Sequence, residues 1–254
     1  MLRASVIINT LNDREDWLRQ AVDSYLAQQN VEIQLIISTV EDDSSLSVLG
    51  NYSNLEFCVS DKNAHQNSRS PRYYQLNNAL NQVEHPWWCF AAGDDVALPH
   101  KLEQEITLCL QTSSQVCSSA IWKTDAHLNR SSMVAMPTDY LGVAKHLQGN
   151  FVADCSLISW DLWKAFGPFD LSLEQMAHWD FWLRVFSECG GDTIVFNSEP
   201  TWLYRIHDDC VHQRDLHSEN RARKREASRK RMLQKHDDLL KRYDLEFLAY
   251  IDRY

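Results

Sequence analysis

The stretch Trp87-Trp-Cys-Phe-Ala-Ala-Gly-Asp-Asp-Val-Ala-Leu-Pro99 joins an apolar run directly to two adjacent carboxylates. Residues 87–92 have the length and composition of a buried strand, and a helical pattern begins at Lys101, just after Pro99. Buried strands of α/β sheets end where the sheet opens into a ligand crevice, so this stretch predicts a strand, an acidic turn and a helix at a binding site. Gly-Asp-Asp is also good turn chemistry, and a purely structural role for both aspartates stays open.

Strand and helix patterns alternate on both sides of this stretch. Such alternation predicts an α/β domain with a mostly parallel central sheet covered by helices. The expected strands cover residues 4–9, 33–38, 55–60, 87–92, 116–123, 155–159, 193–197 and 202–206, and the expected helices lie at 17–26, 74–83, 160–166 and 178–189, besides the one after Pro99.

Length and composition favour one substantial domain, because 254 residues with 44% hydrophobic content can bury a large core. The sequence contains no apolar run near the length of about 20 residues that spans a bilayer. Met1-Leu2-Arg3 leads directly into a strand pattern rather than a signal peptide, so we expect a cytoplasmic protein. The seven cysteines form no Cys-x-x-Cys pair and mostly lie in apolar segments, which favours reduced core thiols.

The formal net charge of -10 argues against nonspecific nucleic-acid binding by the body of the protein. Residues 221–236, RARKREASRKRMLQKH, are strongly basic and are a candidate contact with an anionic membrane surface or an acidic partner. A solvated terminal helix is the favoured alternative, because an apolar stripe is missing until Met232 and Leu233. We therefore divide the chain into a main domain, residues 1–217, and a C-terminal helical extension, residues 218–254.

The acidic turn also carries a family resemblance. Residues 88–102, with Asp94-Asp95 followed by Pro-His-Lys-Leu, resemble the aspartate motif of family 2 inverting glycosyltransferases, which are nucleotide-sugar enzymes with a GT-A fold. The resemblance extends over roughly residues 4–212. It implies a GT-A-like single domain that moves a sugar from a nucleoside diphosphate sugar to an acceptor hydroxyl with inversion, assisted by Mn²⁺ or Mg²⁺. In the family the second aspartate tends to hold the metal, which implies that Asp95 is a metal ligand and Asp94 a donor contact.

Two earlier segments resemble the nucleotide-binding parts of the family. Residues 5–12 are similar to the opening strand and its loop, and residues 33–44 to the second strand and its acidic turn. For the acidic residues of that turn, ordinary capping is an equal alternative. Two arginines in the polar loop before residue 74 are candidate diphosphate contacts, with a solvated loop as the alternative. The candidate donor contacts are Thr10, Asn12, Glu41, Asp42, Asp43, Arg69, Arg72 and Asp94.

Three segments are together similar to the acceptor side of the family: Asp154-Cys-Ser-Leu-Ile-Ser159, Phe166-Gly-Pro-Phe-Asp170 and His178-Trp-Asp-Phe-Trp-Leu-Arg184. In the family the last of them usually reads Glu-Asp-x-Asp-x-x-x-Arg, and the first aspartate is the catalytic base. This chain has Ala177-His178 at the Glu-Asp positions. His178 and Asp180 lie about 200° apart around a helix, so only one of them should face substrate. Asp180 has an i,i+4 partner in Arg184, whereas His178 has no obvious partner. Both stay candidate bases.

Trp202-Leu-Tyr-Arg-Ile-His207 resembles the late Tyr-Arg-x-His segment of the family, which implies that His207 completes the metal site with Asp95. Carboxylates with one imidazole suit Mn²⁺ better than Mg²⁺. The alternative is that this segment only lines the polar face of a strand. His212 and Arg214, in the following loop, are weaker candidates for contact with the diphosphate.

Two other functions stay open. A catalytically degenerate homologue that binds nucleotide or glycan is motivated by Ala92 and His178, which stand where acids are expected. A metal-dependent nucleotidyltransferase can also use paired aspartates on an α/β sheet. The second alternative is less favoured, because the sequence has neither Gly-x-Gly-x-x-Gly nor a Walker-type loop to bind phosphate.

Overall fold

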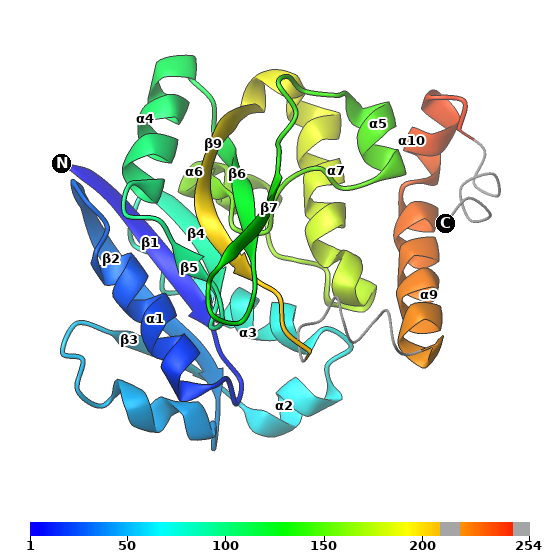
Figure 1. The fold of residues 1–254 in the computed structure, drawn as a ribbon. Helices are drawn as coiled ribbons and strands as arrows, with labels where there is room; N and C mark the ends of the chain where they lie inside the picture. The colour runs from blue at the N-terminus through cyan, green and yellow to red at the C-terminus, as the bar shows by residue number, and fades with distance from the viewer. Residues whose placement is uncertain (209–218, 246–254) are drawn as a thin grey trace.

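The computed structural model describes residues 1–208 and 219–245. Within these residues a nine-stranded sheet has the order β3-β2-β1-β4-β8-β6-β9-β5, and β7 pairs with β6 (Figure 1). The strands are β1 Leu2–Asn9, β2 Val31–Val40, β3 Glu56–Ser60, β4 Trp87–Ala92, β5 Val96–Ala97, β6 Val116–Thr124, β7 Arg130–Val134, β8 Leu157–Ser159 and β9 Ile194–Arg205.

Helices cover both faces of this sheet (Figure 1). The α-helices are α1 Glu15–Leu26, α2 Lys62–Asn67, α3 Pro71–Leu80, α4 Lys101–Thr112, α5 Val143–Gln148, α6 Trp160–Phe166, α7 Ala177–Cys189, α9 Glu219–Lys235 and α10 Asp237–Arg242. Short 3-10 segments are η1 Ser44–Leu49, η2 Leu171–Met176 and η3 Gly191–Thr193.

Strand β1 shows why the sheet forms. Its side chains alternate between two cores: Val6 and Ile8 pack with α1 and α4, whereas Ile7 packs with α3 and α7. A strand buried on both faces reads as a continuous apolar run, and β1 pairs in parallel with both β2 and β4. The expected mostly parallel, helix-covered α/β sheet is confirmed.

The sequence divides the last strand differently from the structure. The two strands expected at 193–197 and 202–206 are one strand, β9, paired in parallel with β6. The ladder shifts register around Ala120, which lies opposite Pro200. A proline cannot donate to the ladder, and the irregularity lets β9 continue past it. The expectation of two strands was therefore wrong.

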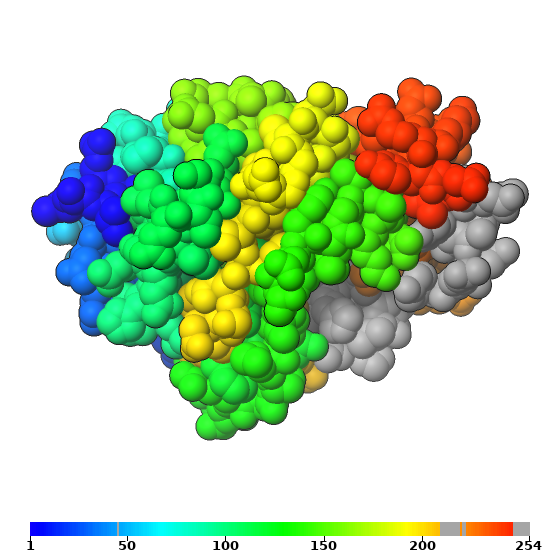
Figure 2. Space-filling view, turned by 90° about the horizontal axis from the view of Figure 1, so that it is seen from above, coloured from blue at the N-terminus to red at the C-terminus, as the bar shows by residue number. Residues whose placement is uncertain are grey.

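The C-terminal helices pack against the main domain rather than standing apart from it. Met232 and Leu233 of α9 are fully buried in the same core as Phe181 and Phe186 of α7. In both views α10 lies beside α5 (Figures 1 and 2). Because the apolar residues of α9 face inward, its outward face is basic and polar, and contact with an anionic surface stays a prediction. Across residues 1–208 and 219–245, no helix has the length and apolar character needed to cross a bilayer.

The cysteines that the structure describes are free thiols, and five of these six are buried. Cys189 is the exposed one. Core thiols are thus confirmed for this part of the chain, while Cys210 lies outside the described residues.

Candidate functional site

The parallel strands β1, β2, β4 and β9 end at one edge of the sheet, and the loops after them carry the predicted site residues (Figure 1). At this edge Oδ2 of Asp94 lies 2.9 Å from Nε2 of His207. Both side chains are partly exposed, at 23% and 14%. The sequence placed His207 beside Asp95, but the structure brings it to Asp94.

Asp95 turns into the protein. Its side chain is buried, and Oδ1 accepts a hydrogen bond of 2.8 Å from the backbone N–H of Arg205. Burial and the neighbouring Asp94 carboxylate raise the pKa of Asp95 well above its usual range, against the hydrogen bond from Arg205. A nearby cation would oppose this rise, because it favours the charged form of a carboxyl group. Metal ligation by Asp95 stays a prediction.

Arg205 braces the acidic turn against α1. Its Nε donates to the carbonyl of Asp94 at 2.6 Å, and a terminal nitrogen donates to Oε1 of Gln20 at 2.7 Å. The guanidinium lies 4.8 Å from the ring centroid of Trp17, and the His207 ring contacts the same indole edge-on at 4.6 Å. Trp17 is therefore both a buried core residue and a packing surface for the His207 ring. The sequence showed it only as an apolar helix residue.

The nucleotide-side candidates separate into two groups. Thr10 is buried at the end of β1, and the N–H of Asn12 donates to Oδ1 of Asp43 at 3.0 Å. The other two acids of the second turn face α2, where Lys62 donates its backbone N–H to Glu41 at 3.2 Å and pairs through Nζ with Asp42 at 3.2 Å. The structure thus brings Asp43 to the loop after β1, whereas the other two lie at the rim.

Asp13 is a site residue that the sequence reading missed. Burial, then the charges of Asp94 and Asp43, raises its pKa to about 6 against hydrogen bonds that favour the ionised form. The acidic turn approaches it so closely that a Cβ added at Gly93 would lie 2.3 Å from Oδ2 of Asp13. The sequence could have indicated Asp13, because this acid directly follows Asn12 in the loop that the resemblance assigns to nucleotide binding.

Arg72 links the donor side to the acceptor side. A terminal guanidinium nitrogen donates to Oδ2 of Asp154 at 3.0 Å, and the guanidinium lies 4.4 Å from the ring centroid of Phe90 on β4. The charge of Asp94 also acts on Arg72. Arg69 lies exposed between α2 and α3. Of the two predicted arginines, only Arg72 reaches the carboxylates described here.

His178 lies in the first turn of α7 with both ring nitrogens engaged. Nε2 accepts a hydrogen bond of 3.0 Å from the indole N–H of Trp182, which is only a donor. Nδ1 lies 2.9 Å from Oδ1 of Asp154, a close contact that is not aligned as a hydrogen bond. Because Nε2 must be unprotonated to accept from Trp182, the neutral ring carries its proton on Nδ1, toward Asp154.

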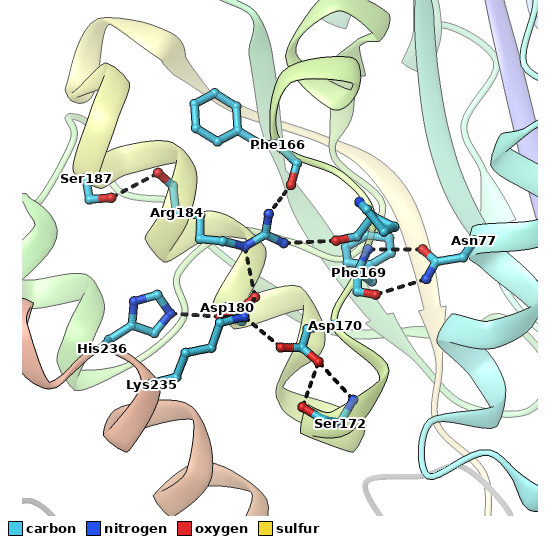
Figure 3. Close-up of polar contacts among 11 residues, drawn as sticks. Asn77, Phe166, Phe169, Asp170, Ser172, Asp180, Arg184, Ser187, Lys235 and His236 are labelled. Atoms are coloured by element: carbon cyan, nitrogen blue, oxygen red, sulfur yellow. Dashed lines mark hydrogen bonds and ion pairs between the residues drawn. The ribbon is translucent and has the colours of Figure 1, made fainter.

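Asp180 faces the other side of α7, as its place in the helix predicts (Figure 3). It is fully buried, and its oxygens lie 3.0 Å from Nε of Arg184, 3.0 Å from Nζ of Lys235 and 2.8 Å from Nε2 of His236. Lys235 also pairs with Asp170 at 2.7 Å. Burial alone would raise the pKa of Asp180, but the hydrogen bonds from His236 and Lys235 outweigh it and lower the pKa. These contacts fasten α9 to α7.

The carboxylate of Asp94 and the imidazole of His207 are the two adjacent groups at the sheet edge that could hold a metal ion. Among the residues that the structure describes, no three His, Cys, Asp or Glu side chains converge as a ready metal site. His212 and Arg214, the weaker diphosphate candidates, lie outside the described residues.

Solved structures of similar fold include those of TarS from S. aureus. TarS 1-349 in complex with UDP-GlcNAc has a TM-score of 0.65 at 16% identity, covering 98% of this chain and 69% of that one. TarS 1-349 in complex with UDP has a TM-score of 0.61 at 18% identity, covering 82% of this chain and 61% of that one. The longer TarS structure has a TM-score of 0.62 at 17% identity, and the match covers 82% of this chain but 37% of TarS. The TM-scores show a shared fold, in agreement with the expected GT-A-like α/β domain.

A search of curated proteins finds no match to this sequence. The family description does match: the model of glycosyl transferase family 2 covers residues 5–152. That range is more than half of the 254 residues and contains β1, the acidic turn and Arg72. The chain therefore belongs to glycosyl transferase family 2.

Proposed function

We propose that this protein transfers a sugar from a nucleoside diphosphate sugar to an acceptor hydroxyl, with inversion and with the help of a divalent metal ion. The contact between Asp94 and His207 carries the proposal, because it sets a carboxylate and an imidazole together at the carboxyl edge of the sheet. Family membership supports sugar transfer. The structure of TarS with UDP-GlcNAc makes a UDP-sugar the first donor to test.

The donor set at this edge fits a manganese ion. Oδ2 of Asp94 and Nε2 of His207 are 2.9 Å apart and partly exposed, and an oxygen with an imidazole nitrogen suits Mn²⁺. We keep Asp95 and His207 as proposed ligands and add Asp94. When bound there, a divalent cation supplies Lewis-acid stabilisation of the charge on a departing diphosphate.

The donor is proposed to lie across the loops after β1, β2 and β4. Thr10, Asn12 and Asp43 are proposed to contact the base and ribose, since the backbone of Asn12 is already tied to Asp43. Arg72 is proposed to contact the diphosphate, because a guanidinium matches phosphate oxygens in charge and geometry. The remaining candidates, at the rim of these loops, are Glu41, Asp42 and Arg69.

The chemistry is a single displacement. The acceptor oxygen bonds to the anomeric carbon as the bond from that carbon to the diphosphate oxygen breaks, and the nucleoside diphosphate leaves with the electron pair. The acceptor proton passes to a basic group on the protein. Because Asp180 is enclosed by cations from α7 and α9, we propose that it holds α7 in place and that deprotonation occurs at the His178 side of the helix.

A screen of UDP-, GDP-, dTDP- and CMP-sugars with and without Mn²⁺ tests this function. We expect one donor to bind and to be hydrolysed slowly in a metal-dependent way by the wild type, and much less by Asp94→Ala. Asp161→Ala, which removes an exposed carboxylate of α6, should behave as wild type. Binding without release of sugar would instead support the degenerate homologue. No binding of any donor by folded protein would reject the nucleotide-sugar assignment.

A further inference from the structure

We propose that Asp154 is the catalytic base, whose carboxylate takes the proton of the acceptor hydroxyl, and that His178 is its positioning residue. This inference rests on the proposed sugar transfer and names the acceptor-side group of that site. Asp154 directly precedes Cys155 in the turn before β8 and begins a segment that resembles the acceptor side of the family, but the resemblance assigns it no role.

His178 cannot itself offer a free basic nitrogen in this arrangement. Its side chain is only 8% exposed, and Nε2, the unprotonated nitrogen, is directed at the buried indole of Trp182. A base needs its lone pair within reach of the proton that it removes. What His178 presents toward the open side is Nδ1, which faces Asp154 and carries the proton.

Asp154 has the access that His178 lacks. Its side chain is 40% exposed, and it lines a small pocket with Tyr73, Phe90, Phe169 and His178. Burial raises the pKa of Asp154, but the adjacent His178 imidazole and Arg72 guanidinium outweigh this and hold the pKa well below its usual range. The carboxylate is therefore ionised and ready to accept a proton.

The contact with Arg72 ties the strength of this base to donor binding. Oδ2 of Asp154 lies 3.0 Å from the guanidinium that we assign to the diphosphate. While Arg72 pairs with Asp154, the carboxylate is a weak base, because a neighbouring cation stabilises its charged form. A bound diphosphate competes for the same guanidinium and so strengthens the base when the donor is in place. Tyr73 lies beside both Arg72 and Asp154. The carboxylate of Asp94, in the turn after β4, also acts on the Arg72 guanidinium.

The proton balance of the step is complete. The acceptor O–H bond breaks and its proton goes to an oxygen of Asp154. The acceptor oxygen bonds to the anomeric carbon, and the bond from that carbon to the diphosphate breaks with its electrons on the diphosphate. His178 keeps its Nδ1 proton throughout and packs against Oδ1 of Asp154 at 2.9 Å, while Oδ2 faces Arg72.

Azide provides a sharp test, because it is a nucleophile that carries no proton to remove. The full chain, with UDP-GlcNAc and Mn²⁺, is given either water or azide as acceptor, and release of UDP and formation of glycosyl azide are measured. We expect Asp154→Asn to lower kcat with water by about 10²- to 10⁴-fold and to leave transfer to azide within about threefold of wild type. Asp161→Asn, an exposed carboxylate on α6, serves as the matched control and should change neither rate.

His178 variants separate positioning from folding. His178→Asn keeps an N–H near the place of Nδ1 and should retain most of the water reaction, whereas His178→Leu should lose about tenfold in kcat with little change in KM for the donor. A merely structural role would lower transfer to water and to azide together. If Asp154→Asn does not fold, as judged by thermal unfolding, Asp154→Ser replaces it, because its hydroxyl still accepts from Arg72.

The outcomes distinguish this inference from the function on which it rests. Equal loss of both reactions in Asp154→Asn, or an unchanged rate with water, would overturn the role of Asp154 while leaving an active glycosyltransferase. Wild-type protein that releases UDP with neither water nor azide would overturn the proposed transfer from this UDP-sugar and the role of Asp154 together.

Discussion

Nε2 of His207 lies 2.9 Å from Oδ2 of Asp94, although 113 residues of chain separate them. If this pair holds the metal, His207→Ala should weaken Mn²⁺ binding in the presence of UDP by at least about tenfold, since a ligand is worth more than 1.4 kcal/mol in a site with few donors. Titration calorimetry measures the change. His100→Ala removes an exposed histidine and should leave binding unaltered. Equal affinities of wild type and His207→Ala would exclude His207 as a ligand.

Asp95 is predicted to matter for stability as well as for any metal. Asp95→Ala leaves the N–H of Arg205 without its 2.8 Å acceptor, which should lower the free energy of unfolding by about 1 to 3 kcal/mol. Asp95→Asn keeps an oxygen there and should lose much less. Urea unfolding without metal compares the two variants. Similar losses in both would show that the charge of Asp95, rather than its hydrogen bond, stabilises the turn.

The ion-pair cluster at Asp180 should be sensitive to removal of this fully buried carboxylate, which lies between α7 and the end of α9 (Figure 3). Asp180→Ala leaves Lys235 and His236 facing a buried gap, and breaking a buried pair in this way costs about 3 to 5 kcal/mol. Lys241→Ala, which breaks an exposed pair with Asp237 on α10, should leave the free energy of unfolding nearly unchanged, because water screens an exposed pair. Chemical denaturation gives both values, and equal effects would argue that α9 is not fastened by Asp180.

His146 predicts a pH dependence of stability. Burial, with a smaller contribution from His178, lowers its pKa from 6.5 to about 3. Between these values the unfolded chain binds the proton and the folded protein does not, so the free energy of unfolding falls as the pH falls from about 6.5 toward 3. His146 contributes at most about 1.4 kcal/mol per pH unit to the slope of the free energy of unfolding against pH.

His146→Phe should remove the contribution of His146 to this pH dependence. The ring of His146 packs edge-on against Phe151 and Phe186, so phenylalanine keeps an aromatic ring in the same place. Unfolding curves from pH 7 to 4 measure the slopes. His127→Phe, at an exposed position, should keep the slope of the wild type. A slope that survives in His146→Phe would assign the pH dependence to other groups.

Gly93 is predicted to be intolerant of even a methyl group. A Cβ there would lie 2.3 Å from Oδ2 of Asp13, so Gly93→Ala must push the Asp13 carboxylate out of its place or shift the acidic turn. We expect donor affinity to fall by about tenfold or more, because the two loops form opposite sides of the site. Gly149→Ala, whose Cβ would meet nothing within 4 Å, is the control. The double variant Gly93→Ala with Asp13→Ser should recover part of the loss if the clash is the cause.

The main sheet could be predicted because its strands are continuous apolar runs with helices between them. Elements with weaker patterns were missed: β7 is an exposed, mostly polar edge strand, and α5 is a helix of only six residues. β9 was divided in two because Pro200 interrupts its pattern, while the register shift that accommodates the proline depends on pairing with β6. Such tertiary accommodation leaves no local trace in the sequence.

The candidate site was predictable only where a motif is local. The acidic turn shows itself as two aspartates after an apolar strand, but which one meets His207 depends on the docking of β9 beside β5. Asp154 was missed because its partners, Arg72 and His178, are 82 and 24 residues away in the chain. Asp180 was a candidate base by sequence, and its companions on α9 lie more than fifty residues downstream.

The chain distance between Asp94 and His207 also bears on the order of folding. The first four strands can pair through nearby segments, but the imidazole reaches the carboxylate only after β9 has paired with β6. Contacts of such long sequence separation form late, because the loop between them must close first. A metal or donor bound at this pair would then hold the completed protein without speeding its assembly, so its stabilisation should slow unfolding far more than it accelerates refolding.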